Sequence, residues 1–213
     1  MKYEAIIFDL DGVICHTDVY HYLAWKKLAD KLGVYFDEHI NHRLRGISRM
    51  ESFEIILEQY KGDPLSHEEK IKYTEEKNHI YQKLLRNMTP DDVSPEVIQT
   101  LQDLRSLGLK LAIGSSSKNA RLILNQIGLE NFFDAISDGN NISKSKPDPE
   151  VFLKASEYLG IPPKKCLVVE DAVSGLQAAL SCNMDCAAIG EATKSSIGTY
   201  KLTTFSDLLN VVG

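Results

Sequence analysis

The stretch AIIFDLDGVI, residues 5–14, places an apolar run directly before two aspartates, Asp9 and Asp11. An ionised carboxylate is costly to bury unless a cation or a proton compensates it. The apolar run is typical of a buried strand, and in a strand that continued through both aspartates their side chains would lie on one face, about 7 Å apart. The stretch therefore predicts that a metal ion or a phosphoryl group binds between Asp9 and Asp11.

Two other interpretations of the DLDG sequence stay open at this point. An EF-hand calcium loop needs glycine at its sixth position and glutamate at its twelfth, whereas Gly12 is fourth when Asp9 is counted as first. An apolar strand also precedes the motif, which makes calcium a poor match. The acids could instead only cap a loop, and the short motif alone does not exclude this.

Strand-like and helical segments alternate through most of the chain. Further strands are expected at 109–113, 135–137, 166–170 and 186–189, and helices at 119–127, 149–159 and 173–183. This alternation predicts an α/β fold with a Rossmann-like parallel sheet. Residues 15–91 show only helical patterns, so we expect an α/β core domain formed by 1–14 and 92–213, with an inserted α-helical cap domain at 15–91.

Three helices are expected in the inserted domain. The first carries an apolar stripe from Trp25 to Leu32 and ends before Gly33, and the second begins at a capping box formed by Ser48 and Glu51. The third covers roughly 67–88, where charge-rich blocks are typical of a solvated face. The linker back to the core is expected at 89–95.

Composition excludes several classes of partner. The 213-residue chain carries a formal net charge of −6 and no Lys/Arg run longer than two, so neither nucleic acid nor an anionic membrane is an expected partner. No apolar run is long enough to span a bilayer, and a soluble, cytoplasmic protein is expected. Its four cysteines lack CxxC spacing, which favours reduced packing residues, although Cys182 and Cys186 remain a weak pair.

A second acid pair follows the strand CLVV, where Glu170 and Asp171 are adjacent. Ligands of parallel sheets gather at the carboxyl ends of the strands. Four carboxylates brought together there would repel one another without a hard cation, and Mg²⁺ prefers such ligands. We therefore expect Asp9, Asp11, Glu170 and Asp171 to bind Mg²⁺.

Two further segments supply groups that bind anions. The strand at 109–113 is followed by GSSSKN, which places hydroxyl and backbone N–H groups before a helix, and Lys146 lies in SKPDP before another helix. The chain has no GxxxxGK[ST] motif, so a P-loop nucleotide site is excluded. Taken singly, GSSSKN is better explained as a serine-rich helix cap and Lys146 as an exposed lysine before proline.

Taken together, FDLDG, GSS, KPDP and VVED form an ordered set, each following a strand, and this set resembles the four motifs of the haloacid dehalogenase (HAD) superfamily. The resemblance covers residues 4 to about 190 and implies a HAD core with a helical cap after the first motif. It also implies Mg²⁺-dependent phosphoryl transfer through a phosphoaspartate on Asp9. Asp11 matters here, because the phosphatases and phosphomutases of the superfamily have an acid at this position and its dehalogenases lack one.

Within the superfamily the chain is most similar to the sugar phosphomutases, through Thr17, His21 and Trp25, the RGISRMES stretch, EEKN at 75–78 and SSSKN at 115–119. The resemblance implies interconversion of β-glucose 1-phosphate and glucose 6-phosphate through β-glucose 1,6-bisphosphate. The catalytic residues it implies are Asp9, Asp11, Ser115, Lys146, Thr17, His21 and Lys77. The substrate-binding residues it implies are Gly46, Ile47, Arg49, Ser52, Trp25, Ser117, Lys118 and Asn119.

In the expected cap, His21 and Lys77 each interrupt an apolar helical stripe. Singly, a lysine that extends its amine to solvent and a hydrogen-bonded, partly buried histidine are the simpler interpretations. Their joint occurrence, with the resemblance, favours contact between them.

The function expected is thus that of a monomeric phosphomutase acting on small sugar phosphates. A small-molecule phosphatase that uses the same Asp9 and Asp11 is the nearest alternative. An inactive phosphate-binding regulatory protein is an alternative of a different class, although the complete set of acids, Ser115 and Lys146 disfavours it.

Overall fold

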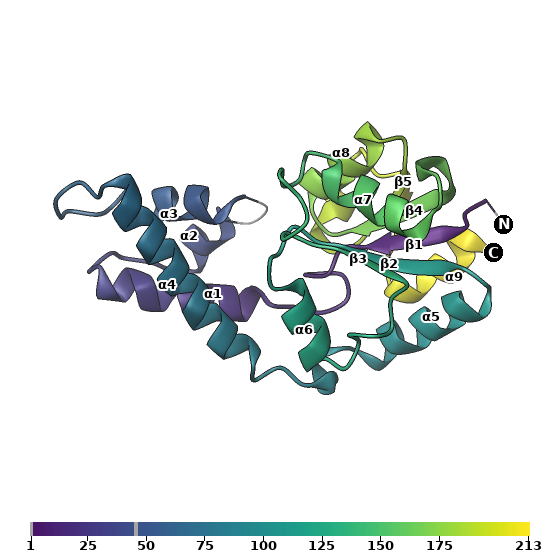
Figure 1. Ribbon diagram of the computed structural model, residues 1–213, viewed down its shortest axis with the longest axis horizontal. Helices are drawn as coiled ribbons and strands as arrows, with labels where there is room; N and C mark the ends of the chain where they lie inside the picture. The colour runs from purple at the N-terminus through teal and green to yellow at the C-terminus, as the bar shows by residue number, and fades with distance from the viewer. Residues whose placement is uncertain (1, 45–46) are drawn as a thin grey trace. The chain divides into compact units, whose positions relative to one another are not determined.

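The computed structural model describes residues 2–44 and 47–213, and the chain divides into two compact units. The core unit comprises the chain up to His16 together with Met88–Gly213, and the helical unit is Thr17–Asn87 (Figure 1). The boundaries expected from the sequence, 14/15 and 91/92, differ from these divisions by a few residues.

A six-stranded parallel sheet forms the centre of the core unit, with strand order β3-β2-β1-β4-β5-β6. Ile7 of β1 lies beside Ala112 of β2 and beside Val168 of β4, so β1 is a central strand. A parallel sheet covered on both faces favours continuous apolar strands, as β1 is and as β4 is up to Val169. The expected parallel α/β fold is confirmed. The strands are β1 (Ala5–Phe8), β2 (Lys110–Gly114), β3 (Ala135–Ser137), β4 (Cys166–Glu170), β5 (Asp185–Ala188) and β6 (Tyr200–Lys201).

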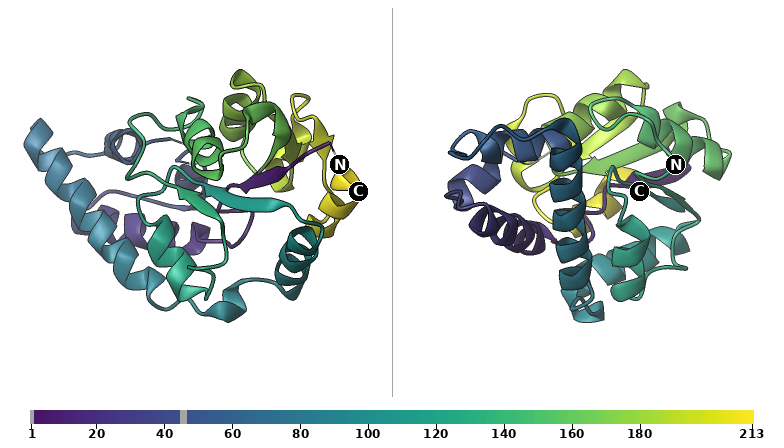
Figure 2. Two further views of the ribbon diagram at one scale, coloured as in Figure 1. Left: turned by 45° about the vertical axis from the view of Figure 1, so that its right-hand side comes forward. Right: turned by 60° about the vertical axis from the view of Figure 1, so that its left-hand side comes forward.

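Helices cover both faces of this sheet, as Figures 1 and 2 show. On one face, Phe152 and Leu176 pack in the same buried cluster as Ile7. On the other face, the ring of Phe8 stacks on Phe205 with centroids 5.7 Å apart. The first face is covered by α7 (Glu150–Leu159) and α8 (Val173–Ser181), and the second by α5 (Pro95–Ser106), α6 (Ala120–Gln126) and α9 (Leu208–Val212).

The sequence patterns left α5, α9 and β6 unassigned. The start of α5 does carry a local signal, since the Ser94 side chain accepts a hydrogen bond from the Val97 N–H and Pro95 is the first helical residue. The two residues of β6 carry none, because a strand this short has no periodicity. Instead it is held by distant contacts, among them a hydrogen bond of 2.9 Å between the hydroxyls of Tyr3 and Tyr200.

In the helical unit, the described residues form helices and no strand. The predicted capping box is confirmed, since Ser48 accepts from the Glu51 N–H while the Glu51 carboxylate accepts from the Ser48 N–H. A buried cluster that includes Trp25, Leu28 and Phe53 forms the core of this unit. The helices are α1 (Asp18–Lys31), α2 (Glu38–His42), α3 (Arg49–Leu57) and α4 (His67–Leu85), of which α2 was not expected.

All four cysteines are buried and carry free thiols, which confirms their assignment as reduced packing residues. Burial raises the pKa of the Cys166 thiol to about 11. No helix that the structure describes combines the length and the apolar character needed to cross a membrane.

Candidate active site

The first motif leaves the sheet where the strand predicted at residues 5–8 ends. Strand β1 ends at Phe8, and Asp9 still donates its backbone N–H to the carbonyl of Val169 at 2.9 Å. The chain then turns, because Gly12 adopts a left-handed conformation (φ +85°) and donates to the carbonyl of Cys15 at 2.7 Å. The extended geometry predicted through Asp11 is therefore wrong, and Asp11 lies in a turn at the end of the strand.

Three carboxylates meet at the carboxyl ends of β1 and β4. Oxygens of Asp9, Glu170 and Asp171 all lie within 4.8 Å of one another. Asp9 is 7% exposed and Glu170 2% exposed. The side chain of Asp11 does not belong to this group, which is the one such group of acids, histidines or cysteines found over residues 2–44 and 47–213.

Lys146 points its ammonium at the same group. Its Nζ lies 2.5 Å from Oδ1 of Asp9 and 3.3 Å from Oε2 of Glu170. Burial alone would lower the pKa of Lys146, but the charges of Asp9 and Glu170 outweigh burial and raise the pKa above its ordinary value. Lys146 is therefore a charged, buried partner of Asp9.

The charges of this cluster do not balance. Three carboxylates face one ammonium, which leaves a formal excess of two negative charges. Burial and then the charge of Asp9 raise the pKa of Glu170 well above its ordinary value, although Lys146 opposes the shift. A hard divalent cation with oxygen ligands matches both the donor atoms and the missing charge. The cluster is thus a candidate site for a metal ion.

Two glycines leave the space that these carboxylates occupy. A Cβ on Gly12 would lie 2.1 Å from an oxygen of Asp171, and a Cβ on Gly175 would lie 2.1 Å from Oε1 of Glu170. The sequence patterns did not single out Gly175 as part of a site. A signal existed, since glycine inside a helix usually has a packing or functional reason.

The GSSSKN segment forms a loop between β2 and α6. Ser115 is buried, and its Oγ accepts from the Ser117 N–H at 3.2 Å, while Oγ of Ser117 accepts from the Asn119 N–H at 3.1 Å. Each hydroxyl therefore remains able to donate its proton elsewhere. Lys118 is exposed and Asn119 buried.

Gly139, which the sequence patterns also missed, packs against this loop. Its N–H donates to the carbonyl of Ser117 at 3.1 Å, and a Cβ there would lie 2.4 Å from the carbonyl oxygen of Ser116. The side-chain amide of Asn140 donates to the carbonyl of Lys118 at 3.0 Å. The segment after β3 thus supports the backbone of the serine loop.

In the helical unit, Lys77 and His21 meet as expected, with Nζ 2.9 Å from Nδ1. An ammonium only donates, so Nδ1 accepts and the neutral ring carries its proton on Nε2. Burial, followed by the charges of Lys77 and Arg49, holds the pKa of His21 well below its ordinary value. Lys77 is 3% exposed, and its ammonium lies over the rings of Trp25 (4.6 Å) and Tyr81 (4.8 Å).

Thr17 and Trp25 belong to the same surroundings. The hydroxyl of Tyr81 donates to Oγ1 of the buried Thr17 at 2.9 Å. Trp25 is 3% exposed and stacks nearly parallel on Phe53, with centroids 6.1 Å apart. The ring of Trp25 therefore lies in the core of the helical unit, beneath the Lys77 ammonium.

The other residues expected to bind substrate lie on and before α3. Arg49 is half-buried and donates to Oδ1 of Asn78 at 3.0 Å, and burial lowers its pKa. Ser52 is buried and Ile47 exposed. Gly46 lies outside the described residues.

Replacing His21 and Lys77 tests their coupling. We expect His21→Ala and Lys77→Ala each to destabilise the protein, and the double variant to lose less than the sum, with a coupling of about 1 kcal/mol. The reason is that each single variant leaves its partner without this hydrogen bond. Chemical denaturation of the four proteins measures the coupling, and Lys72→Ala, which changes an exposed lysine of α4, is the control. Additive losses of stability would contradict the coupling between His21 and Lys77.

The fold and the carboxylate cluster place the chain among known proteins. A family model described as haloacid dehalogenase-like hydrolase matches residues 3–183, and the chain belongs to this family. It is therefore an enzyme of the HAD superfamily, as the four motifs predicted.

Its relatives include mutases and phosphatases. The chain is 40% identical to a β-phosphoglucomutase of Bacillus subtilis, over 88% of this chain and 84% of that protein. The crystal structure of a β-phosphoglucomutase from Clostridium difficile is 40% identical with a TM-score of 0.86, covering 97% of this chain and 93% of that one. A phosphorylated carbohydrates phosphatase of Thermotoga maritima is 30% identical, over 85% and 82% of the two chains.

Proposed function

We propose that the protein is a magnesium-dependent phosphomutase that interconverts β-D-glucose 1-phosphate and glucose 6-phosphate through β-glucose 1,6-bisphosphate. The observation that carries the proposal is the buried Asp9–Lys146 ion pair beside Glu170 and Asp171. The chain that contains this ion pair is 40% identical to a β-phosphoglucomutase over most of the length of both proteins.

Asp9 is the proposed nucleophile. One of its carboxylate oxygens forms a bond to the phosphorus of the donor, and the bond from phosphorus to the departing sugar oxygen breaks. The ammonium of Lys146, which lies 2.5 Å from Asp9, stabilises charge on the transferring phosphoryl oxygens, and Ser115 donates to them. Mg²⁺ held by Asp9, Glu170 and Asp171 would supply the remaining positive charge.

Asp11 is the proposed general acid and base. It protonates the sugar oxygen that leaves phosphorus in one half-reaction, and it takes the proton of the attacking sugar hydroxyl in the other, a role worth roughly 10²- to 10⁴-fold in rate. Its position in the turn after β1, two residues from Asp9, suits a group that acts on the oxygen bound to the same phosphorus.

The other proposed roles follow from the resemblance. Thr17, His21 and Lys77 would support the acid and base. Lys77 contacts His21 directly, and all three contact Tyr81, which suits such a network. The reacting sugar phosphate would be bound by Gly46, Ile47, Arg49, Ser52, Trp25, Ser117, Lys118 and Asn119.

Phosphorus NMR tests the function, with Arg49→Ala as the informative variant. With Mg²⁺, β-glucose 1-phosphate and a trace of bisphosphate, the wild type should yield glucose 6-phosphate and little inorganic phosphate. Arg49→Ala should lower the mutase rate by about two orders of magnitude, because a charge-assisted contact with the second phosphate is worth about 3 kcal/mol. The hydrolysed fraction should rise.

Arg43→Ala is the matched control, since this exposed arginine of the same unit pairs with Glu58. It should behave as the wild type. Inorganic phosphate as the main product of the wild type, with Arg49→Ala unchanged, would replace the mutase with a sugar phosphatase. The Thermotoga maritima relative, named as a phosphatase, is the observation that favours this second candidate. The cytoplasmic location and the monomeric state of the enzyme stay predictions.

A further inference from the structure

Lys146 lies in the segment between β3 and α7, and the position of its ammonium depends on how this segment is held. Its backbone N–H makes only a long contact, 3.4 Å, with Oγ of Ser116. The side chain, by contrast, is 8% exposed and pairs with Asp9 and Glu170. Other groups must therefore hold the backbone on either side of Lys146.

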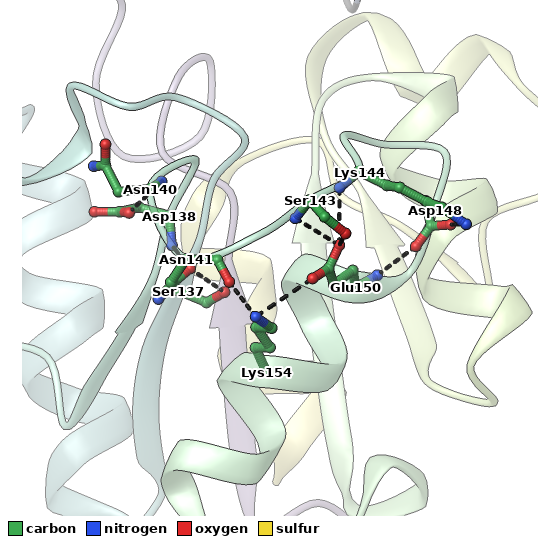
Figure 3. Close-up of polar contacts among 9 residues, drawn as sticks. All are labelled: Ser137, Asp138, Asn140, Asn141, Ser143, Lys144, Asp148, Glu150 and Lys154. Carbon is green, nitrogen blue, oxygen red and sulfur yellow. Dashed lines mark hydrogen bonds and ion pairs between the residues drawn. The ribbon is translucent and has the colours of Figure 1, made fainter.

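Glu150, the first residue of α7, is the main anchor of this segment (Figure 3). Its Oε2 accepts three hydrogen bonds, from the N–H of Ser143, the hydroxyl of Ser143 and the N–H of Lys144, each 2.8 Å long. The hydrogen bond from the Ser143 side chain leads the causes that lower the pKa of Glu150 to about 2. Glu150 is thus a carboxylate that fixes the backbone two residues before Lys146.

The other oxygen of Glu150 extends this anchor toward β3. Oε1 lies 3.3 Å from the ammonium of Lys154, one helical turn further along α7. Lys154 also donates to the carbonyl of Asn141, whose side chain accepts from the N–H of Asp138 at 2.9 Å. Polar contacts therefore connect the end of β3 with the first turns of α7, as Figure 3 shows.

On the other side of Lys146, the chain is fixed to the start of α7. Asp148 donates its N–H to the carbonyl of Ser145 at 3.1 Å, and its Oδ1 accepts from the N–H of Glu150 at 3.0 Å. Lys146 is therefore the centre of a short turn whose two ends both converge on Glu150.

We propose that Glu150 is a positioning residue that holds the Lys146 ammonium against Asp9 and Glu170. Its kinetic consequence rests on the proposed function, whereas its structural consequence does not. A charge-assisted carboxylate suits this role better than an amide, because three donors converge on one oxygen. In Glu150→Gln, either a neutral amide oxygen must accept all three hydrogen bonds, or the side-chain NH₂, which cannot accept a hydrogen bond, must face the three donors.

Acylation of lysines tests the structural consequence directly. Wild type and Glu150→Gln, each with Mg²⁺, are treated with a limiting amount of an N-hydroxysuccinimide ester of acetate, and modified sites are quantified by mass spectrometry against the exposed Lys164. In the wild type, Lys146 should react slowly because it is buried and paired. In Glu150→Gln its relative reactivity should rise by about tenfold, the scale of losing one charge-assisted hydrogen bond.

Steady-state kinetics with β-glucose 1-phosphate test the kinetic consequence of this positioning role. Glu150→Gln should lower kcat about tenfold with little change in KM, since Lys146 is proposed to act on charge that develops in the transition state. Glu157→Gln, an exposed glutamate of the same helix, is the matched control and should change neither acylation nor kcat. Ser143→Ala removes one of the three donors without touching the helix, and it should shift both readouts in the same direction by a smaller factor.

The outcomes separate this inference from the proposed function. Unchanged Lys146 reactivity in Glu150→Gln and Ser143→Ala would overturn the positioning role even if the wild type proves to be a mutase. Raised reactivity in a protein that has no mutase activity would support the positioning role and reject the function. Equal effects of Glu150→Gln and Glu157→Gln would assign the change to the helix as a whole and overturn the inference.

Discussion

Replacing Asp9 with asparagine is expected to abolish the phosphoenzyme and to lower turnover by on the order of 10⁴-fold or more, as losing a nucleophile does in other enzymes. An amide is no substitute for the carboxylate oxygen that attacks phosphorus, and, being neutral, it attracts the Lys146 ammonium less strongly. The measurement is incorporation of ³²P from labelled bisphosphate after acid quenching, with hydroxylamine used to cleave an acyl phosphate.

The fold should survive this change. Asp9→Asn removes one charge from a cluster with an excess of negative charge, so its melting temperature without Mg²⁺ should not fall below that of the wild type. Asp91→Asn, at an exposed aspartate of the core unit, is the matched control and should label normally. A hydroxylamine-sensitive adduct that persists in Asp9→Asn would assign the nucleophile to another residue.

Gly175→Ala should have the second-largest effect, although this residue carries no reactive group. The added Cβ would lie 2.1 Å from Oε1 of Glu170, so the carboxylate must leave its place beside Lys146. We expect Mg²⁺-dependent turnover to fall by more than about 100-fold, because the clash displaces the ligand itself, and losing a residue that only supports a ligand already costs roughly 10- to 100-fold. Thermal denaturation across a MgCl₂ titration measures Mg²⁺ binding independently of turnover, because an ion that binds only the folded state stabilises the folded protein.

Ser174→Ala makes a change of similar size at the preceding residue and should leave the Mg²⁺ dependence of the melting temperature as in the wild type. If Gly175→Ala retains both the wild-type shift with MgCl₂ and normal turnover, Glu170 does not need its present position. Glu170 would then be excluded as a metal ligand.

Much of the candidate site in the core unit could be predicted from the sequence. Asp9, Ser115 and Glu170 each directly follow or end a strand that is recognisable from its apolar run, and the carboxyl ends of neighbouring parallel strands meet at one edge. Lys146 needed the family resemblance in addition, because it lies in a segment without periodicity, nine residues after β3 ends at Ser137.

The remaining features depend on contacts that no local pattern encodes. The conformation of the turn at Asp11 follows from the left-handed Gly12, so a rule for regular strands could not give it. The space beside Gly175 appears only when α8 packs next to Glu170. Spacing did place Lys77 and His21 on inward faces, but the two aromatic rings under the ammonium come from different helices and required the tertiary structure.

The central position of β1 has a consequence for biosynthesis. Ala5 pairs with Lys110 on one side and with Cys166 on the other, so the first strand to be made has no sheet partner until more than a hundred further residues have followed. At roughly 5–20 residues per second, this apolar strand waits on the order of ten seconds on the ribosome. The helical unit is compact and formed by the continuous segment Thr17–Asn87, so its chain is complete well before then. Nascent chains should therefore hold a folded helical unit beside an unpaired, aggregation-prone strand, which is the stage at which a chaperone would bind.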